Sequence, residues 1–287
     1  MTKTIAITGA TGQLGRLAVA ALKTRAAGAS LIALVRDPAK AADLGIEARA
    51  FDYHATAALP EALKGVDVLV LISSNDFNDR AGQHRNVIAA AKDASVKRIV
   101  YTSILKGDAS PMILAGDHIA TEEALAASGI PATILRNGWY TENYTGNIAG
   151  VLASGAVAGA NASAKIAPAT RADFAEAIAV TAADDVHAGK VYELAGDEAF
   201  TMAEYAAEIA RQSGKPVAHA PMTEAAYADL LKSFGLPEPV AAIFADSDAR
   251  AGEGALFDDS HTLSRLIGRP TTPLKDAVAA ALSPVTA

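Results

Sequence analysis

Short apolar runs alternate with helix-like segments through the first half of the chain, and this alternation limits the folds open to it. The first run, residues 4–8, is rich in isoleucine and ends at Gly9, and apolar residues at helical spacing follow over residues 14–24. Further apolar runs lie at residues 31–35, 47–51, 66–72, 98–102 and 131–135, and further helix-like segments at residues 57–63, 80–94 and 116–128. Strands that alternate with helices pair in parallel, because each helix returns the chain to the same end of the sheet. The pattern predicts an α/β fold with a doubly wound parallel sheet and helices on both faces.

The alternation loosens beyond Trp139. One more strand is expected near residues 191–195, and helix-like segments lie at residues 201–212, 223–234 and 273–282. We therefore divide the chain into a sheet-forming domain over residues 1–138 and a smaller, helix-rich C-terminal segment over residues 139–287. The strand near residues 191–195 would help to complete the sheet.

Composition and charge exclude several classes of function. The chain has no cysteine, so disulfides, thiolate catalysis and cysteine-ligated zinc are excluded, and its histidines show no metal-ligand spacing. The net charge of −7, without a long basic run, disfavours nucleic-acid binding, which needs clustered lysine and arginine to neutralise phosphates. No apolar run approaches the ~18 residues that span a bilayer, and the N-terminus lacks the apolar stretch of a signal peptide. These features predict a cytoplasmic protein that binds no metal, membrane or nucleic acid.

A glycine-spaced loop joins the first predicted strand to the first predicted helix. It consists of Gly9, Ala10, Thr11, Gly12, Gln13, Leu14 and Gly15. Gly9 permits the sharp turn from strand to helix, Gly12 lets backbone amides approach a pyrophosphate, and Gly15 lets the helix pack closely on the sheet. The helix then points its unpaired amides and the positive end of its dipole at the phosphates. The spacing alone is weak evidence, but with its flanking strand and helix it predicts a dinucleotide site, the alternative being a glycine turn without a ligand.

Arg36 ends the second predicted strand, about 20 residues beyond the glycine loop. An acidic residue at this place would bind the ribose 2′-hydroxyl of NAD, whereas an arginine suits the 2′-phosphate of NADP. The adjacent Asp37 weakens this electrostatic preference, and a solvated arginine at a strand end is the alternative. Asp52, which follows the third strand, is expected either to bind the adenine amino group or to form a turn. The sequence thus favours NADP(H) over NAD(H).

Small polar and aromatic residues follow the fourth, fifth and sixth strands. They are Ser73, Ser74, Asn75, Thr102, Ser103, Asn137, Gly138, Trp139, Tyr140, Thr141, Glu142 and Asn143. All would open at the carboxyl edge of the sheet, where ligands bind in open α/β folds. Their polar groups could hydrogen-bond the ribose or the nicotinamide, and helix capping is the alternative for each of them.

The run from Ile7 to Gly15 resembles the start of an atypical short-chain dehydrogenase of the NmrA-like group. Further stretches resemble the bacterial NAD(P)H:quinone oxidoreductases of this group, with triphenylmethane reductases as relatives. These stretches are Gln83 to Asn86, Tyr101 to Ser103, Leu135 to Tyr140, Tyr192 to Asp197 and Leu256 to Asp259. The resemblance extends nearly end to end. It implies a Rossmann domain with a small C-terminal substrate segment, and cofactor contacts at Gly9 to Leu14, Arg36, Ser73 to Asn75 and Asn137 to Asn143.

One departure from most short-chain dehydrogenases bears on the chemistry. Their Tyr-x-x-x-Lys motif on the helix after the fifth strand is replaced here by His118 and Glu122, and Tyr101 on the preceding strand is followed four residues later by Leu105. The usual alcohol–ketone proton relay is therefore absent. A quinone tolerates this loss, because it accepts hydride readily and the product can take its proton from water. No flavin-specific feature is present, so direct hydride transfer from NADPH to a quinone or a dye-like acceptor is expected.

The candidate catalytic residues are Tyr140, Asn143 and His118. His118 and Glu122 share a helix face, so Glu122 would orient an imidazole proton donor, or the two form a surface pair that stabilises the helix. Tyr140 is expected to stack on the quinone or nicotinamide ring, whereas core packing is favoured for Trp139.

Two other functions stay open. Relatives in the wider group bind dinucleotide without catalysis and control a partner regulator, and the missing Tyr-x-x-x-Lys motif fits such a redox sensor equally well. The same hydride chemistry also serves the reduction of dyes, azo compounds or nitro compounds. The sequence leaves open the physiological acceptor, the source of the proton and whether the protein is a homo-oligomer.

Replacement of Arg36 tests the expected NADP preference. Arg36→Ala should cost about 1.5–3 kcal/mol of NADPH affinity, the scale of a charge-assisted hydrogen bond, and should barely change NADH affinity. Calorimetric titrations of both proteins with both cofactors measure this. Equal affinities of the unmutated protein for NADPH and NADH would refute the role of Arg36.

Overall fold

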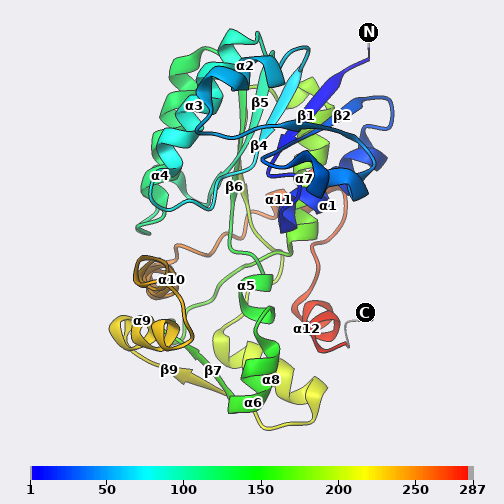
Figure 1. Cartoon of the computed structure of the whole chain (residues 1–287). Coiled ribbons are helices and arrows are strands. Elements are labelled where there is room, and N and C mark those ends of the chain that lie inside the picture. Colours follow the sequence, from blue (N-terminus) through cyan, green and yellow to red (C-terminus); the bar gives the residue numbers. More distant parts are fainter. Residues whose placement is uncertain (1, 284–287) are drawn as a thin grey trace. The chain divides into compact units, whose positions relative to one another are not determined.

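Parallel strands form the central sheet of this computed structural model, which describes residues 2–283 (Figure 1). Its seven strands are β1 (Thr4–Thr8), β2 (Ser30–Val35), β3 (Glu47–Ala50), β4 (Val68–Leu71), β5 (Arg98–Ile104), β6 (Ala132–Asn137) and β8 (Val191–Leu194). They are ordered β3-β2-β1-β4-β5-β6-β8, so the winding reverses between β1 and β4. The predicted doubly wound α/β fold is confirmed.

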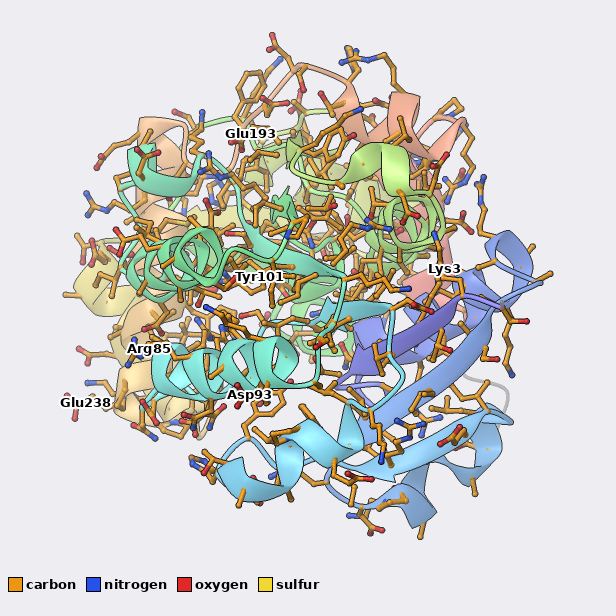
Figure 2. All side chains as sticks on the ribbon, turned by 90° about the horizontal axis from the view of Figure 1, so that it is seen from above. Lys3, Arg85, Asp93, Tyr101, Glu193 and Glu238 are labelled. Carbon is orange, nitrogen blue, oxygen red and sulfur yellow. The ribbon has the colours of Figure 1, made fainter. Side chains whose placement is uncertain are left out.

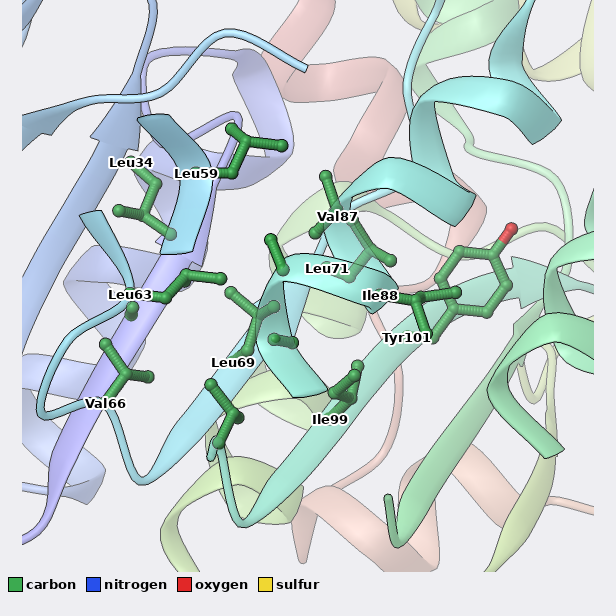
Figure 3. Close-up of a cluster of buried hydrophobic side chains, with 14 of the residues drawn as sticks. Leu34, Leu59, Leu63, Val66, Leu69, Leu71, Val87, Ile88, Ile99 and Tyr101 are labelled. Carbon is green, nitrogen blue, oxygen red and sulfur yellow. The ribbon is translucent and has the colours of Figure 1, made fainter. Parts of the chain in front are cut away.

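Helices cover both faces of this sheet. On one face α1 (Gln13–Arg25) packs against α7 (Arg171–Ala183), and the other face carries α2 (Leu59–Ala62), α3 (Arg80–Asp93) and α4 (Ala115–Ser128) (Figure 1). Figure 3 shows the apolar cluster beneath α3, in which Val87 and Ile88 of the helix meet Leu71 of β4 and Ile99 of β5. All four β4 residues are buried, as expected for a strand covered on both faces.

Contacts divide the chain into two units that are interleaved in sequence. The first contains the chain up to Gly107, Asp117–Asn137 and Arg171–Tyr192, and the second contains Asp108–Gly116, Gly138–Thr170 and the chain from Glu193 onward. The functional division at residue 138 stays a prediction. The structure adds that the segment Arg171–Tyr192 returns to the first unit after the chain has entered the second.

The helix α7 was not expected from the sequence. Its buried residues include Phe174, Ile178 and several alanines on all sides, so no polar stripe marks a helical period. Arg98 at the start of β5 is 3% exposed and donates to the carbonyls of Thr181 (2.7 Å) and Ala182 (3.0 Å) in the last turn of this helix. A cation at a helix C-terminus is favourable, and this one ties α7 to the sheet.

The second unit is helix-rich, as expected. Its helices are α5 (Glu142–Thr145), α6 (Ile148–Ser154), α8 (Met202–Ser213), α9 (Glu224–Ser233), α10 (Glu238–Arg250), α11 (Thr262–Ile267) and α12 (Leu274–Leu282). The expected helices correspond to α8, α9 and α12, and α8 begins with a capping box between Thr201 and Glu204. A two-stranded parallel sheet of β7 (Ala156–Gly159) and β9 (Ala218–Pro221) was not expected, because both strands are short and half exposed.

Short 3-10 turns complete the description. They are η1 (Pro38–Leu44), η2 (Thr56–Ala58), η3 (Gly107–Ala109), η4 (Asp185–His187) and η5 (Ala251–Glu253). The helix expected over residues 57–63 is η2 followed by the single turn of α2.

The turn from β1 into α1 depends on two glycines. Gly9 has a φ of +60°, a left-handed conformation that side chains disfavour, and its carbonyl accepts a hydrogen bond from the amide of Gly12 (2.9 Å). A Cβ added at Gly15 would lie 2.1 Å from the Gly9 carbonyl oxygen and 2.8 Å from the Ala10 Cα. Gly15 therefore lets the helix pack on the loop backbone itself, rather than on the sheet as expected.

A buried imidazole joins α3 to α4. His84 is fully buried, its Nδ1 lies 2.9 Å from Oγ1 of Thr121, and its Nε2 accepts a hydrogen bond from the amide of Ser74 (3.0 Å). Thr121 Oγ1 in turn donates to the carbonyl of Asp117 (2.8 Å), so the ring is neutral with its proton on Nδ1. Burial, and then the charge of Arg80, lower the pKa of His84 to about 3.

Gly15→Ala should destabilise the protein by about 1–3 kcal/mol, although alanine favours helix, because the methyl group must displace the loop backbone. Urea denaturation measures this. Gly28→Ala is the matched control, since an added Cβ there meets nothing within 4 Å. Equal free energies of unfolding for the two variants would contradict the close approach of α1 to the loop.

The buried His84 should make the free energy of unfolding decrease as the pH is lowered. Histidine in the unfolded chain titrates near pH 6.5, whereas the folded pKa is about 3, so below about pH 6.5 the unfolded state binds the extra proton. His84→Gln removes this titration and keeps an acceptor near Nε2. From about pH 6 to about pH 4.5 the unmutated protein should lose about 2 kcal/mol more free energy of unfolding than the variant. Parallel pH profiles in urea denaturation would show that His84 is not buried in its neutral form.

Candidate active site

The glycine loop and the turn after β4 lie side by side at the point where the strand order reverses. Oγ1 of Thr8, the last residue of β1, accepts a hydrogen bond from the amide of Ile72, just beyond β4 (3.0 Å). Gly12 is the N-cap of helix α1, and no side chain caps the first amides of this helix. An open α/β sheet binds its ligands at this reversal, and uncapped helix amides attract anions. The loop Gly9 to Gly15 therefore has the geometry of a phosphate cradle.

The end of β2 separates the roles of Arg36 and its acidic neighbour. Arg36 is exposed and forms no ion pair with the described residues. Oδ1 of Asp37 accepts a hydrogen bond from the amide of Ala39 (3.1 Å), so this carboxylate caps η1. Asp52 similarly accepts from the amide of His54 (3.0 Å), which supports its interpretation as a turn residue.

The turn after β4 is held by side chains of neighbouring elements. The amide of Ser73 donates to Oγ1 of Thr102 (2.9 Å), and the amide of Ser74 donates to Nε2 of His84. Thr102 and Ser103 were expected to follow the fifth strand. They instead lie within β5, which extends to Ile104, and both are buried. Helix capping, the alternative considered for these residues, is not what the structure shows.

Tyr101 and His118 form a buried pair that the sequence analysis missed. Tyr101 lies in the interior of the first unit, whereas Arg85 of α3 is exposed (Figure 2). The Tyr101 hydroxyl lies 2.8 Å from Nδ1 of His118. Burial raises the pKa of Tyr101 well above its usual range, and burial, followed by the charge of Arg80, lowers the pKa of His118. At neutral pH the pair is therefore a protonated tyrosine hydrogen-bonded to an uncharged imidazole.

Glu122 does not orient His118, and the two do not form a surface pair. His118 is only 6% exposed. The carboxylate of Glu122 accepts from Oγ of Ser103 (2.5 Å) and from Nε (3.1 Å) and Nη2 (2.7 Å) of Arg136. The orienting role of Glu122 and the surface pair were both wrong, because spacing of four residues places two side chains on one helix face but does not select their partners. The role of His118 as a proton donor stays a prediction.

Asn137, the last residue of β6, has a buried side-chain amide without a hydrogen-bond partner among the described residues. The residue is 3% exposed, and both its Oδ1 and its Nδ2 are buried without a hydrogen-bond partner among the described residues. A buried amide left without partners is costly, so a polar ligand group at this place would satisfy it. Asn137 and the glycine loop belong to the same unit.

The remaining predicted residues, Gly138 to Asn143, belong to the second unit. The amide of Gly138 donates to the carbonyl of Leu194 (2.7 Å), and that of Thr141 to the carbonyl of Ala169 (2.9 Å). Trp139 is 9% exposed and packs edge-on against Phe244, with ring centroids 6.1 Å apart, which supports the packing interpretation. Tyr140 is half-buried, and its role in stacking stays a prediction, as do the roles of Glu142 and Asn143.

Within residues 2–283, no group of three or more histidine, aspartate or glutamate side chains could hold a metal ion. In the same range no helix is long and apolar enough to cross a membrane.

Comparison with known proteins agrees with this geometry. Over 277 residues the chain is 53% identical to Quinone oxidoreductase 2 of Escherichia coli (strain K12), a match that covers 96% of this chain and 97% of that protein. A crystal structure of an NADPH-dependent quinone oxidoreductase from Escherichia coli, complexed with NADPH, superposes with a TM-score of 0.94 at 52% identity and covers 97% of this chain and 100% of that chain. The triphenylmethane reductase of Citrobacter sp., complexed with NADP(H), gives a TM-score of 0.91 at 36% identity over 97% of this chain and 100% of that chain. Residues 1–280 match the model of the NmrA-like family, and this chain is a member of that family.

Proposed function

We propose that this protein is an NADPH-dependent oxidoreductase that transfers hydride to a quinone. The observation that carries the proposal is the 53% identity to Quinone oxidoreductase 2 over nearly the whole of both chains. Fold alone would not support an activity, because many functions share this sheet.

The residues of the first unit fit NADPH. Uncapped amides at the start of α1 suit the pyrophosphate, and the partnerless amide of Asn137 suits a polar group of the cofactor. Arg36 is available for a 2′-phosphate because Asp37 is engaged with the Ala39 amide, so we propose that NADPH is preferred over NADH. NADPH bound there would supply the hydride.

The protein's own groups favour positioning over proton transfer. Tyr101 keeps its proton at neutral pH because burial raises its pKa, and its hydroxyl is hydrogen-bonded to Nδ1 of His118. His118 is an uncharged imidazole at neutral pH and has no readily released second proton, because its pKa is lowered. We propose that Tyr140 and Asn143 orient a quinone or dye-like acceptor, and that solvent provides the proton after hydride transfer.

Tyr140→Ala should lower kcat/KM by on the order of tenfold, about 1.4 kcal/mol of transition-state binding, through lost stacking and orientation. Tyr140→Phe, the matched control, keeps the ring and should keep most of the activity. His118→Ala should stay within a few-fold of the unmutated rate at neutral pH. Steady-state NADPH oxidation with 1,4-benzoquinone measures all three variants.

Two outcomes would contradict this account in different ways. A loss of about 10²–10⁴-fold in His118→Ala alone, the usual scale of general acid catalysis, would make His118 the proton donor and overturn the positioning mechanism. Tight NADPH binding without turnover of any quinone by the unmutated protein would instead favour a redox sensor.

A further inference from the structure

Three consecutive amides of the turn after β4 donate to side chains of three different elements. Ile72 donates to Thr8 of β1 (3.0 Å), Ser73 to Thr102 of β5 (2.9 Å) and Ser74 to His84 of α3 (3.0 Å). The turn therefore takes its shape from its neighbours. It lies beside the glycine loop at the reversal of strand order, where open α/β sheets bind their ligands.

Helix α3 holds every polar group of Ser74. His84 accepts from its amide, Oε1 of Gln83 accepts from its Oγ (2.6 Å), and Nε of Arg80 donates to its carbonyl (2.6 Å). Arg80, Gln83 and His84 are spaced i, i+3 and i+4, so they share one helix face. All three are at least 95% buried, which is rare for such polar residues.

Each of these three side chains is itself fixed in the orientation that meets Ser74. Nε2 of Gln83 donates to Oδ2 of Asp76 (2.7 Å), which turns its amide oxygen toward Ser74. Nδ1 of His84 is bonded to Thr121, which leaves Nε2 as the acceptor. The Arg80 guanidinium lies 4.8 Å from the ring centroid of Phe77. We call Arg80, Gln83 and His84 the clamp, because their side chains hold Ser74 and are themselves held by neighbouring residues.

We propose that Arg80, Gln83 and His84 are positioning residues for NADPH, which act by holding the turn Ser73 to Asn75 in its binding conformation. This rests on the proposed function, because it assigns the turn to the NADPH site. Binding to a preformed wall avoids the entropy of ordering it, so loss of the clamp should weaken NADPH binding. It should leave kcat at saturating NADPH nearly unchanged, because none of the three is proposed to touch the reacting atoms.

His84→Leu removes the acceptor of the Ser74 amide at similar volume, and His84→Gln retains one. We expect the dissociation constant of NADPH, measured by calorimetry, to rise roughly tenfold in His84→Leu and to stay within about threefold in His84→Gln. Amide hydrogen exchange of residues 72–76 should accelerate in His84→Leu and not in His84→Gln. Gln83→Met, which loses the acceptor of Ser74 Oγ and the bond to Asp76 but keeps the acceptor of the Ser74 amide, should give a smaller rise and serves if His84→Leu does not fold.

Asn86→Ala is the matched control on the same helix. Nδ2 of Asn86 donates to the carbonyl of Tyr53 (3.1 Å), whereas the α3 side chains that hydrogen-bond Ser74 are Arg80, Gln83 and His84. The variant should therefore lower the Tm without changing NADPH affinity. NADPH affinity unchanged in both His84→Leu and Gln83→Met, or weakened equally by His84→Gln, would overturn the clamp. So would equal weakening by Asn86→Ala. These affinities need no turnover, so a failure of quinone reduction would be seen separately, as NADPH binding without activity.

Discussion

The packing of Gly15 against the Gly9 carbonyl is the contact on which the candidate site depends. It lets α1 begin directly at the end of β1, so that the uncapped amides of the helix open at the reversal of strand order between β1 and β4. The turn after β4 lies at the same place, because the amide of Ile72 donates to Oγ1 of Thr8 at the end of β1. A side chain at position 15 would push α1 away from the glycine loop. The uncapped amides of α1 would then no longer lie beside the turn after β4.

A second feature is the buried polar layer between the sheet, α3 and α4. Arg80, His84, Tyr101 and His118 lie in it, and each has at least one hydrogen bond to a described residue. The charge of Arg80 helps to keep both imidazoles neutral, and the amide of Ser74 fixes Nε2 of His84 as an acceptor. These hydrogen bonds connect the turn after β4, α3, β5 and α4, so they favour one arrangement of turn and helices. The layer therefore supports binding geometry, and it offers no readily released proton at neutral pH.

The sequence predicted what local pattern determines. Apolar runs marked the strands of the large sheet, and the glycine spacing located the β1–α1 turn. It did not predict α7, whose buried residues lie all around the helix, or β7 and β9, which are short and half exposed. At the site, spacing placed His118 and Glu122 on one face but could not show that their partners are Tyr101 and Arg136. The spacing of Arg80, Gln83 and His84 was present in the sequence, but only the fold brings Ser74 to that face.

The central claim is that the first unit binds NADPH and that hydride passes directly from it to a quinone. The most direct test is a single-turnover experiment, in which the metal-free, flavin-free protein saturated with NADPH is mixed with substoichiometric 1,4-benzoquinone and the dihydronicotinamide absorbance is followed. The account predicts that one NADPH is oxidised for each quinone reduced, with a slower rate when the transferred hydrogen is deuterium. Tight NADPH binding with no loss of absorbance, or turnover only after a flavin is added, would contradict it.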